Sequence, residues 1–404
     1  MKVLPMMYRI AVPVLVCCLL SLNVSHAARK AKKPAKVPTP APAQIAPSYI
    51  CVDAESGLVL AESNADEPRP AASMVKMLEF LLVSEGLEQG TWTLDAPLVI
   101  SRNAEHMGGS QVYLKEGETW TLGRLMPAVA VASANDAAMA VAEGLWGSAD
   151  AFLKLANQRV KQLGMNDSEF HSVHGLPPDK GEQPDRTTAR DMATLARHCV
   201  QVPVILGWSS QQSLEFRPGE AIKENTNRLL GRVPGCDGLK TGFTRAAGWC
   251  VTATAKRGEI RVIVVVMGFD GDSDRFDLAQ HLLEEGFSQI RRVCLITRGK
   301  AIEEPVPVAN CETPAVRLEA ADDLWINVKS EDVGRMKVSA SLPKRLRAPV
   351  AVGTKVGAVH AQLDGQTLRS VPLVVPADLK AAGWRWKLEH AAMPARPPMQ
   401  SSAR

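Results

Sequence analysis

The sequence lacks the cysteine and histidine clusters that metal and redox sites need. None of its eight cysteines stands in Cys-x-x-Cys spacing, which argues against a zinc site and a thioredoxin-like site. His171 and His174 are close in sequence, but two histidines without a third ligand do not form a metal site. We therefore expect the protein to work without a metal or a cofactor.

Acidic residues are absent from residues 1–36, which hold seven Lys or Arg residues. With +7 in this segment and +4 on the whole chain, the remaining residues carry a net charge of −3. A role in nucleic-acid binding therefore has no support. The basic segment is typical of a solvated tether.

An apolar run long enough for an ordinary membrane span is also missing at the N-terminus. The run over residues 10–22 is too short, yet Lys2 and Arg9 precede it and small residues follow at 25–27. This pattern predicts a secretory signal peptide over residues 1–27, with an uncleaved anchor as the alternative. Residues 28–47 are basic and then rich in Pro and Ala, which predicts an extended linker.

Export would bring the six cysteines beyond residue 27 into an oxidising compartment, where disulfides can form. Cys236 with Cys250, and Cys294 with Cys311, are candidate pairs because they are near in sequence. Spacing does not fix the connectivity, so free buried thiols are an equal alternative.

The most informative stretch is a helix start that carries a hydroxyl and an amine in an apolar run. Pro70 precedes it, and residues 74–83 are almost unbroken apolar. Ser73 and Lys76 lie one helical turn apart, on one face. A desolvated, neutral lysine could take the proton of a serine nucleophile. Alternatively, Ser73 caps the helix and Lys76 reaches solvent.

The order of patterns predicts an α/β (α+β) fold. Strands are expected at 49–53 and 58–60, and again at 236–241, 249–255 and 260–267. Helical patterns fill the part of the chain between them, and a last amphipathic helix is expected at 276–287. The strands would form one antiparallel sheet with a helical lobe inserted, in a domain over residues 48–292.

After this domain, short alternating segments predict a small all-β domain over residues 293–376. Residues 377–404 form a tail in which 377–392 is weakly helical. Trp384 and Trp386 stand there beside basic residues. Such a helix could touch a membrane surface, and a tail without membrane contact is equally open.

Two further motifs decide how Ser73 is interpreted. Ser133-x-Asn135 stands at a helix break, and Lys240-Thr241-Gly242 stands at a strand end. Together with Ser73-x-x-Lys76 they form, in this order, the active-serine set of penicillin-recognising enzymes. The chain resembles the low-molecular-mass penicillin-binding proteins, which are exported serine-type D-alanyl-D-alanine carboxypeptidases. The resemblance covers roughly residues 45–375.

The resemblance implies a role for each motif residue. Ser73 would be the acylated nucleophile, Lys76 its general base and Ser133 the proton relay to the leaving D-alanine. Asn135 would bind the peptide amide, and Lys240 and Thr241 the terminal carboxylate. After Gly242 the strand edge is open, so the backbone N–H groups of Ser73 and Phe243 would form the oxyanion hole. A second positive charge at Lys240 would also favour a neutral Lys76.

The sequence departs from the family pattern at two motif positions. Phe243 stands where the family often has His, and Ala134 where Gly is usual. By the same resemblance Arg275 and Arg190 could lie near the substrate carboxylate, with structural ion pairs as an equal alternative. The loop match assigns His171 and His174 to shaping the site.

The leading hypothesis is therefore a carboxypeptidase that removes the terminal D-alanine from peptidoglycan stem peptides and is acylated by β-lactam antibiotics. The family implies a periplasmic location, with attachment to the outer face of the inner membrane through the tail as a further option. The alternatives are a D,D-endopeptidase, a class A-like β-lactamase with Glu169 as the deacylating carboxylate, and a wall-binding protein without activity. The β-lactamase fold has no use for the extra β domain.

Overall fold

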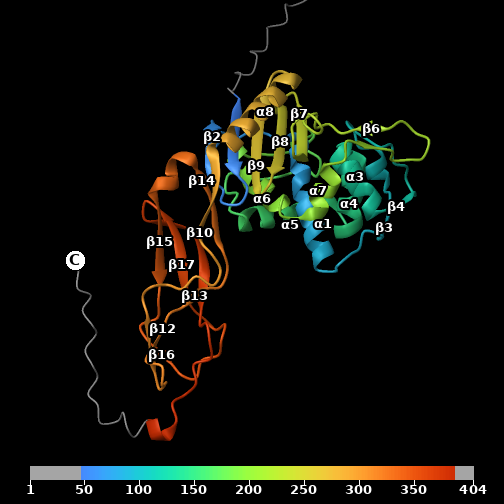
Figure 1. Cartoon of the computed structure of the whole chain (residues 1–404). Coiled ribbons are helices and arrows are strands. Elements are labelled where there is room, and N and C mark those ends of the chain that lie inside the picture. The colour runs from blue at the N-terminus through green and yellow to red at the C-terminus, as the bar shows by residue number, and fades with distance from the viewer. Residues whose placement is uncertain (1–46, 387–404) are drawn as a thin grey trace, which may run out of the picture. The chain divides into compact units, whose positions relative to one another are not determined.

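The computed structural model describes residues 47–386. The expected signal peptide, the linker up to residue 46 and the tail from residue 387 lie outside the described residues. The elements from β1 to α8 are called the first domain here, and those from β10 to β18 the second domain (Figure 1).

The first domain contains the following elements: β1 (Ser48–Asp53), β2 (Val59–Ser63), the 3-10 helix η1 (Ala72–Val75), α1 (Lys76–Glu88), β3 (Pro97–Val99), α2 (Arg102–Glu105), β4 (Thr119–Thr121), α3 (Leu122–Val131), α4 (Asn135–Trp146), α5 (Ala149–Gln162), α6 (Ala189–Cys199), α7 (Pro203–Ser209), β5 (Ser213–Leu214), β6 (Lys223–Glu224), β7 (Cys236–Thr244), β8 (Gly248–Arg257), β9 (Ile260–Phe269) and α8 (Asp272–Gln289).

One antiparallel sheet of order β2-β1-β9-β8-β7 organises this domain. The N-terminal hairpin and the β7–β9 meander are therefore confirmed, and so is their union in one sheet. The first strand pairs with β9, so segments about 200 residues apart in the sequence close the sheet. The helical lobe is inserted between the two halves of the sheet, as the sequence predicts.

Helices cover both faces of the sheet. Since successive residues of a strand point to opposite faces, one strand contributes side chains to both of the packed layers. On β9, Ile263 and Val265 face the core that α1, α3, α4 and α6 share. Their neighbours Val264 and Val266 pack instead with Phe276 of α8. The long apolar β9 run is thus explained by burial on two sides.

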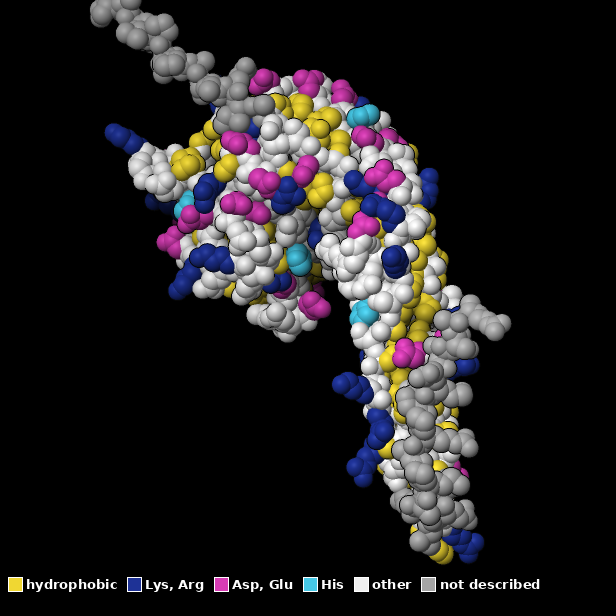
Figure 2. Space-filling view, turned by 90° about the vertical axis from the view of Figure 1, so that its left-hand side faces the viewer, with side chains coloured by type: hydrophobic (Ala, Val, Ile, Leu, Met, Phe, Trp, Pro, Cys, Tyr) yellow, Lys and Arg dark blue, Asp and Glu magenta, His cyan; other side chains and the backbone are white. Residues whose placement is uncertain are grey.

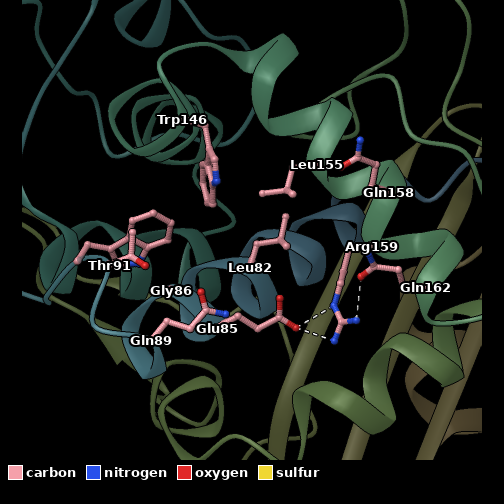
Figure 3. A pocket seen from close by; sticks show the side chains of 11 residues that line it. Leu82, Glu85, Gly86, Gln89, Thr91, Trp146, Leu155, Gln158, Arg159 and Gln162 are labelled. Atoms are coloured by element: carbon pink, nitrogen blue, oxygen red, sulfur yellow. Dashed lines mark hydrogen bonds and ion pairs between the residues drawn. The ribbon is translucent and has the colours of Figure 1, made fainter.

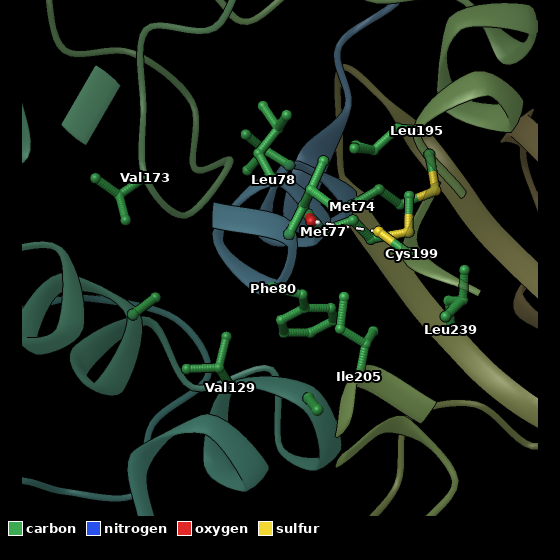
Figure 4. Close-up of a cluster of buried hydrophobic side chains, with 14 of the residues drawn as sticks. Met74, Met77, Leu78, Phe80, Val129, Val173, Leu195, Cys199, Ile205 and Leu239 are labelled. Atoms are coloured by element: carbon green, nitrogen blue, oxygen red, sulfur yellow. Dashed lines mark hydrogen bonds between the residues drawn. The ribbon is translucent and has the colours of Figure 1, made fainter. Parts of the chain in front are cut away.

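Residues 76–84 of α1 are buried on every side, which accounts for the almost unbroken apolar sequence of this part of the helix. Met77, Leu78 and Phe80 of α1 and Met74 of the preceding η1 belong to one buried hydrophobic cluster (Figure 4). The Sγ atom of Cys199 on α6 donates to the backbone oxygen of Met77 at 3.6 Å. The two charged residues in this buried part of the helix, Lys76 and Glu79, have no access to bulk water.

Charged side chains of both signs are interspersed over the first domain on the face that Figure 2 shows. Within the first domain, Arg190 forms ion pairs of 2.6 Å with both Glu62 and Asp66. Its expected alternative role, a structural ion pair, is the one that the structure supports.

The second domain is rich in strands: β10 (Ile290–Ile296), β11 (Val306–Ala309), β12 (Ala315–Val316), β13 (Glu319–Ala320), β14 (Leu324–Lys329), the 3-10 helix η2 (Ser330–Arg335), β15 (Met336–Ser341), β16 (Leu346–Arg347), β17 (Lys355–Leu363) and β18 (Gln366–Val374). Its largest sheet has the order β13-β18-β17-β15 and covers a core of its own.

The expected helix over residues 377–392 is wrong in its first part. Leu379 pairs with Val350 and Ala381 with Cys311, each through an isolated β-bridge, so this segment extends the β domain. Helical geometry begins only at Trp384, whose side chain is 69% exposed. No helix within residues 47–386 is long and apolar enough to cross a membrane.

All six cysteines of the described residues are free. The candidate pairs Cys236–Cys250 and Cys294–Cys311 are therefore not bonded, and the free-thiol alternative holds. Cys250 is fully buried, and its Sγ donates instead to the backbone oxygen of Ala247 at 3.4 Å.

Candidate active site

Ser73 lies on a one-turn 3-10 helix, and α1 begins three residues later at Lys76. The sequence places Ser73 at the start of the α-helix; the structure differs because the left-handed φ of +47° at Ala72 turns the chain just before it. The consequence predicted from the spacing still holds. The Lys76 Nζ atom lies 3.0 Å from the Ser73 Oγ atom.

The Lys76 amine is fully buried and has three oxygen neighbours. Besides Ser73 Oγ, it donates to Asn135 Oδ1 at 2.7 Å and to the backbone oxygen of His174 at 2.9 Å. Burial lowers the pKa of Lys76 to about 7, although the charges of Glu79, Asp185 and Asp136 act in the opposite direction. A substantial fraction of this amine is therefore neutral at pH 7.

The two amide oxygens give the neutral amine a direction. A neutral amine has two N–H donors and one lone pair. If the oxygens of Asn135 and His174 accept the two donors, the lone pair points at the Ser73 hydroxyl. This is the arrangement that proton abstraction from a serine requires.

The long loop before α6 contributes through its backbone. Gly175 has a φ of +79°, and a Cβ atom there would lie 2.0 Å from the backbone oxygen of Ala72. Only glycine allows this approach. The approach brings the His174 oxygen to Lys76 and within 3.2 Å of Ser73 Oγ. Sequence reasoning missed this acceptor, because a backbone oxygen leaves no trace in the residue type.

The Ser-x-Asn motif stands between α3 and α4, as expected. Ser133 has a φ of +57° and is 5% exposed, and Asn135 begins α4. The Asn135 Nδ2 atom donates to the backbone oxygen of Gly108 at 2.6 Å. This contact fixes the amide so that its oxygen faces Lys76.

The Lys-Thr-Gly motif lies on β7, the edge strand of the sheet. Lys240 is 1% exposed, and its Nζ atom donates to the backbone oxygen of Thr241 at 2.9 Å. Burial, and then the charges of Lys76 and Arg275, hold the pKa of Lys240 well below its usual range. The Thr241 hydroxyl donates to the hydroxyl of Thr226 at 2.7 Å, a residue that sequence reasoning did not find.

Gly242 and Phe243 complete the site from the same strand. A Cβ atom on Gly242 would lie 3.1 Å from the Ser73 backbone nitrogen, so glycine lets β7 approach the nucleophile closely. Phe243 is 47% exposed, and its ring stacks on Trp249 of β8 with centroids 3.9 Å apart. The two residues are direct partners in the β7–β8 register.

These motifs meet in one open cavity of about 450 Å³. Its lining includes all three motif regions through Ser73, Ser133, Asn135, Thr241, Gly242 and Phe243, together with Gly109, Ser110, Leu176, Thr226, Trp249 and Arg275. Lys76 and Lys240 lie behind this wall, buried.

Arg275 both lines this cavity and has structural contacts. It donates to the backbone oxygens of Gly242 and Cys250, at 3.1 and 2.7 Å, and pairs with Asp272 at 2.5 Å. Arg275 therefore forms the expected structural ion pair and also lines the cavity of Ser73.

Other candidates from the sequence lie apart from the nucleophile. The Glu169 side chain is 60% exposed, its carboxylate lies 3.9 Å from His171 Nε2, and neither residue lines the cavity of Ser73. His174 acts through its backbone, while its ring accepts from the backbone nitrogen of Leu176 at 3.1 Å. Within residues 47–386, no cluster of three or more potential metal ligands occurs.

A second cavity, of about 520 Å³, lies at the far end of α1 (Figure 3). Trp146, Leu82 and Leu155 form its apolar side, and Glu85 pairs with Arg159 at 2.8 Å on the other. It contains no motif residue.

Comparison with known proteins follows the same division of the chain. A family model described as D-alanyl-D-alanine carboxypeptidase matches residues 35–271. A model described as the C-terminal domain of penicillin-binding protein 5 matches residues 292–381.

Individual relatives match over most of their length. D-alanyl-D-alanine carboxypeptidase DacF of Bacillus subtilis is 32% identical over 84% of this chain and 87% of its own. The crystal structure of penicillin-binding protein 5 from Haemophilus influenzae is 29% identical and covers 82% of this chain and 97% of its own, with a TM-score of 0.69. Penicillin-binding protein D2 from Listeria monocytogenes in its ampicillin-bound form is 34% identical over 59% of this chain and 96% of its own, with a TM-score of 0.54.

Proposed function

Because the chain belongs to the D-alanyl-D-alanine carboxypeptidase family, we propose that it removes the terminal D-alanine from peptidoglycan stem peptides through an acyl-enzyme on Ser73. Membership confirms the resemblance that the three motifs indicate. The observation that carries the proposal is the 3.0 Å approach of the buried Lys76 amine to the Ser73 hydroxyl.

In the first step Ser73 Oγ would attack the carbonyl carbon of the last peptide bond while its proton passes to Lys76 Nζ. The backbone N–H groups of Ser73 and Phe243 would hold the oxyanion, which the close approach of Gly242 to Ser73 supports. Ser133 would then relay this proton from Lys76 Nζ to the D-alanine nitrogen as the C–N bond breaks and D-alanine leaves. Water would hydrolyse the acyl ester and release Ser73.

The substrate ends in a carboxylate, and the cavity offers groups suited to one. The Thr241 hydroxyl and the Arg275 guanidinium line it, with Lys240 buried behind Thr241. A carboxylate entering here would compensate positive charges that have little solvent. Asn135, which lines the same cavity, would bind the peptide amide.

The position of Glu169 does not support its role as the deacylating group of a class A-like β-lactamase. Glu169 is exposed and does not line the cavity of Ser73. The second domain, which matches the C-terminal domain of penicillin-binding protein 5, also argues for the carboxypeptidase. A D,D-endopeptidase would use the same acyl-enzyme, and its reaction products distinguish it from a carboxypeptidase.

We further propose export to the periplasm, with the tail touching the outer face of the inner membrane. The charged and apolar pattern of residues 1–27 supports export, and the exposed Trp384 supports the surface contact.

The test uses residues 28–404 as wild type, Ser73→Ala and the control Ser288→Ala, which changes an exposed serine of α8. A fluorescent penicillin reports acylation, and D-alanine release from a peptide ending in D-Ala-D-Ala reports turnover. We expect a persistent label and D-alanine release in the wild type and the control, and neither in Ser73→Ala.

Each other outcome contradicts a stated part of the proposal. A label that persists in Ser73→Ala overturns the nucleophile. Rapid penicillin turnover without D-alanine release indicates a β-lactamase. Cleavage of the cross-links between stem peptides, without D-alanine release, indicates an endopeptidase. Neither activity in the wild type would leave a binding protein.

A further inference from the structure

A carboxyl group without a partner lies one helical turn beyond Lys76. Glu79 on α1 is 0% exposed, and neither of its carboxyl oxygens has a hydrogen-bond partner within residues 47–386. Its sequence neighbours Leu78 and Phe80 belong to the hydrophobic core around α1 (Figure 4).

Such a group is unexpected on structural grounds alone. Buried polar atoms are nearly always hydrogen-bonded, because a desolvated group without a partner destabilises the fold. An apolar side chain of similar size would pack at position 79 without this cost. The carboxyl group therefore calls for a role other than packing.

The nearest titratable group along the helix is the proposed general base. Residues three apart on a helix have Cβ atoms about 5–6 Å apart, so Glu79 and Lys76 are neighbours. The Lys76 amine already has three oxygen neighbours, on Ser73, Asn135 and His174. These contacts leave no N–H for Glu79, which can therefore act on Lys76 only through its electrostatic field.

We propose that Glu79 is a positioning residue that acts through Lys76 and sets the pH below which this amine keeps its proton and cannot accept the one from Ser73. The inference rests on the proposed function, since it concerns the proton that moves from Ser73 Oγ to Lys76 Nζ during acylation. Glu79 itself gains and loses nothing in that step.

The charges around Lys76 agree with this role. Burial lowers the pKa of Lys76 to about 7, and Glu79 is the strongest of the three carboxylates that raise it again, before Asp185 and Asp136. In turn, burial raises the pKa of Glu79 well above its usual value, and Lys76 is the charge that opposes this. The two groups therefore titrate as a coupled pair.

The other two carboxylates that act on Lys76 form hydrogen bonds that hold the local structure. Asp136 on α4 accepts from the backbone nitrogens of Val112 and Leu114, and Asp185 accepts from Ser172. Lys240 on β7 carries charge of the same sign as Lys76, and the ring of His174 has its pKa lowered by burial and by Lys76. Glu79 alone in this set lacks a hydrogen bond within the described residues.

The sign of the expected effect follows. Removing the carboxyl group of Glu79 leaves burial less opposed, so the pKa of Lys76 falls. The amine then stays neutral to lower pH, and the acid limb of the acylation rate moves down. A change of about one pH unit corresponds to a roughly tenfold gain in acylation rate below the midpoint.

The experiment measures the second-order rate of acylation by a fluorescent penicillin between pH 5 and 9. It compares wild type with Glu79→Gln, Glu79→Met and the control Glu88→Gln, which changes an exposed glutamate of the same helix. We expect the acid midpoint to fall by about one pH unit in both Glu79 variants and to stay unchanged in Glu88→Gln. Glu79→Met should also keep or raise the thermal unfolding midpoint, since it removes an unpaired buried carboxyl.

Every other result counts against the inference in a distinct way. Folded, labelled variants with an unchanged midpoint overturn the role of Glu79. If Glu79→Met fails to fold, the carboxyl has a structural partner and the premise is wrong. If the wild type is never labelled, the proposed function itself is overturned, and this inference falls with it.

Discussion

At the scale of single residues, the hydrogen-bond partners of the two buried motif lysines suit them to different proposed roles. Lys76 is suited to the proposed role of general base, because its amine is desolvated and held by two amide oxygens. Lys240 is as deeply buried, but among the described residues its Nζ atom donates only to the backbone oxygen of Thr241. We expect a substrate carboxylate to supply the missing negative charge, which would couple binding to the positive charge of Lys240.

The stacked pair Phe243–Trp249 predicts a preference for aromatic β-lactam side chains. Phe243→Ala should lower the rate of acylation by benzylpenicillin by up to about tenfold, because an aromatic contact contributes roughly 0.5–1.5 kcal/mol. The rate with 6-aminopenicillanic acid, which lacks the aromatic group, should change little. Stopped-flow acylation with both compounds measures the difference.

The control for this prediction is Phe243→Tyr, which keeps the ring and should keep the preference. An equal loss with both compounds in Phe243→Ala would show instead that the ring positions the backbone N–H of β7.

The motifs predicted which of their own residues come together in the site, but not the other groups that contact them there. Their side chains carry the chemistry, so their spacing and order were informative. The contacts of Thr226 with Thr241 and of the His174 oxygen with Lys76 were not predicted, because they depend on how distant segments fold together. Glu79 escaped because it stands in a run that periodicity marks as core, and burial without a partner is visible only in three dimensions.

At the scale of elements, two helical glycines are expected to respond oppositely to alanine. A Cβ atom on Gly86 of α1 would lie 2.1 Å from the ring of Trp92. This ring is fixed by its donation to the Val83 oxygen at 3.1 Å and by its packing on Trp146. Gly86→Ala should destabilise the fold by about 1–3 kcal/mol despite the better helix propensity of alanine.

Gly207 of α7 is the matched control, since a Cβ atom there would meet nothing within 4 Å. Gly207→Ala should stabilise by up to about 1 kcal/mol. Thermal unfolding of both variants decides the point. A Gly86→Ala midpoint at or above that of wild type would show that Trp92 moves freely.

Long periodic elements were predicted well, and short ones were not. The sheet strands and α8 follow clear patterns, whereas α7 has seven residues and β5 and β6 two each. The β10 strand was missed because Arg291 and Arg292 interrupt its apolar pattern. Residues 377–383 were expected to be helical, but pairing with Val350 and Cys311 overrides that weak local preference.

At the scale of the whole molecule, the thiols should remain free even after export. The denatured chain of residues 28–404 should titrate six thiols without a reductant. In the native protein the buried thiols should react slowly, because burial raises the pKa of Cys51 to about 12 and that of Cys250 to about 11. Thiol titration with and without denaturant tests this. Fewer than six thiols in denaturant would reveal a disulfide.

The left-handed backbone of Ser133 has a consequence for how this protein could evolve. A side chain other than glycine at a φ of +57° costs about 1–2 kcal/mol, so glycine at this position would relax the fold while removing the hydroxyl. Selection for heat resistance alone would therefore favour losing the proposed relay. Thermostable descendants of this chain would keep their hydrolytic power only if each generation were also screened for turnover.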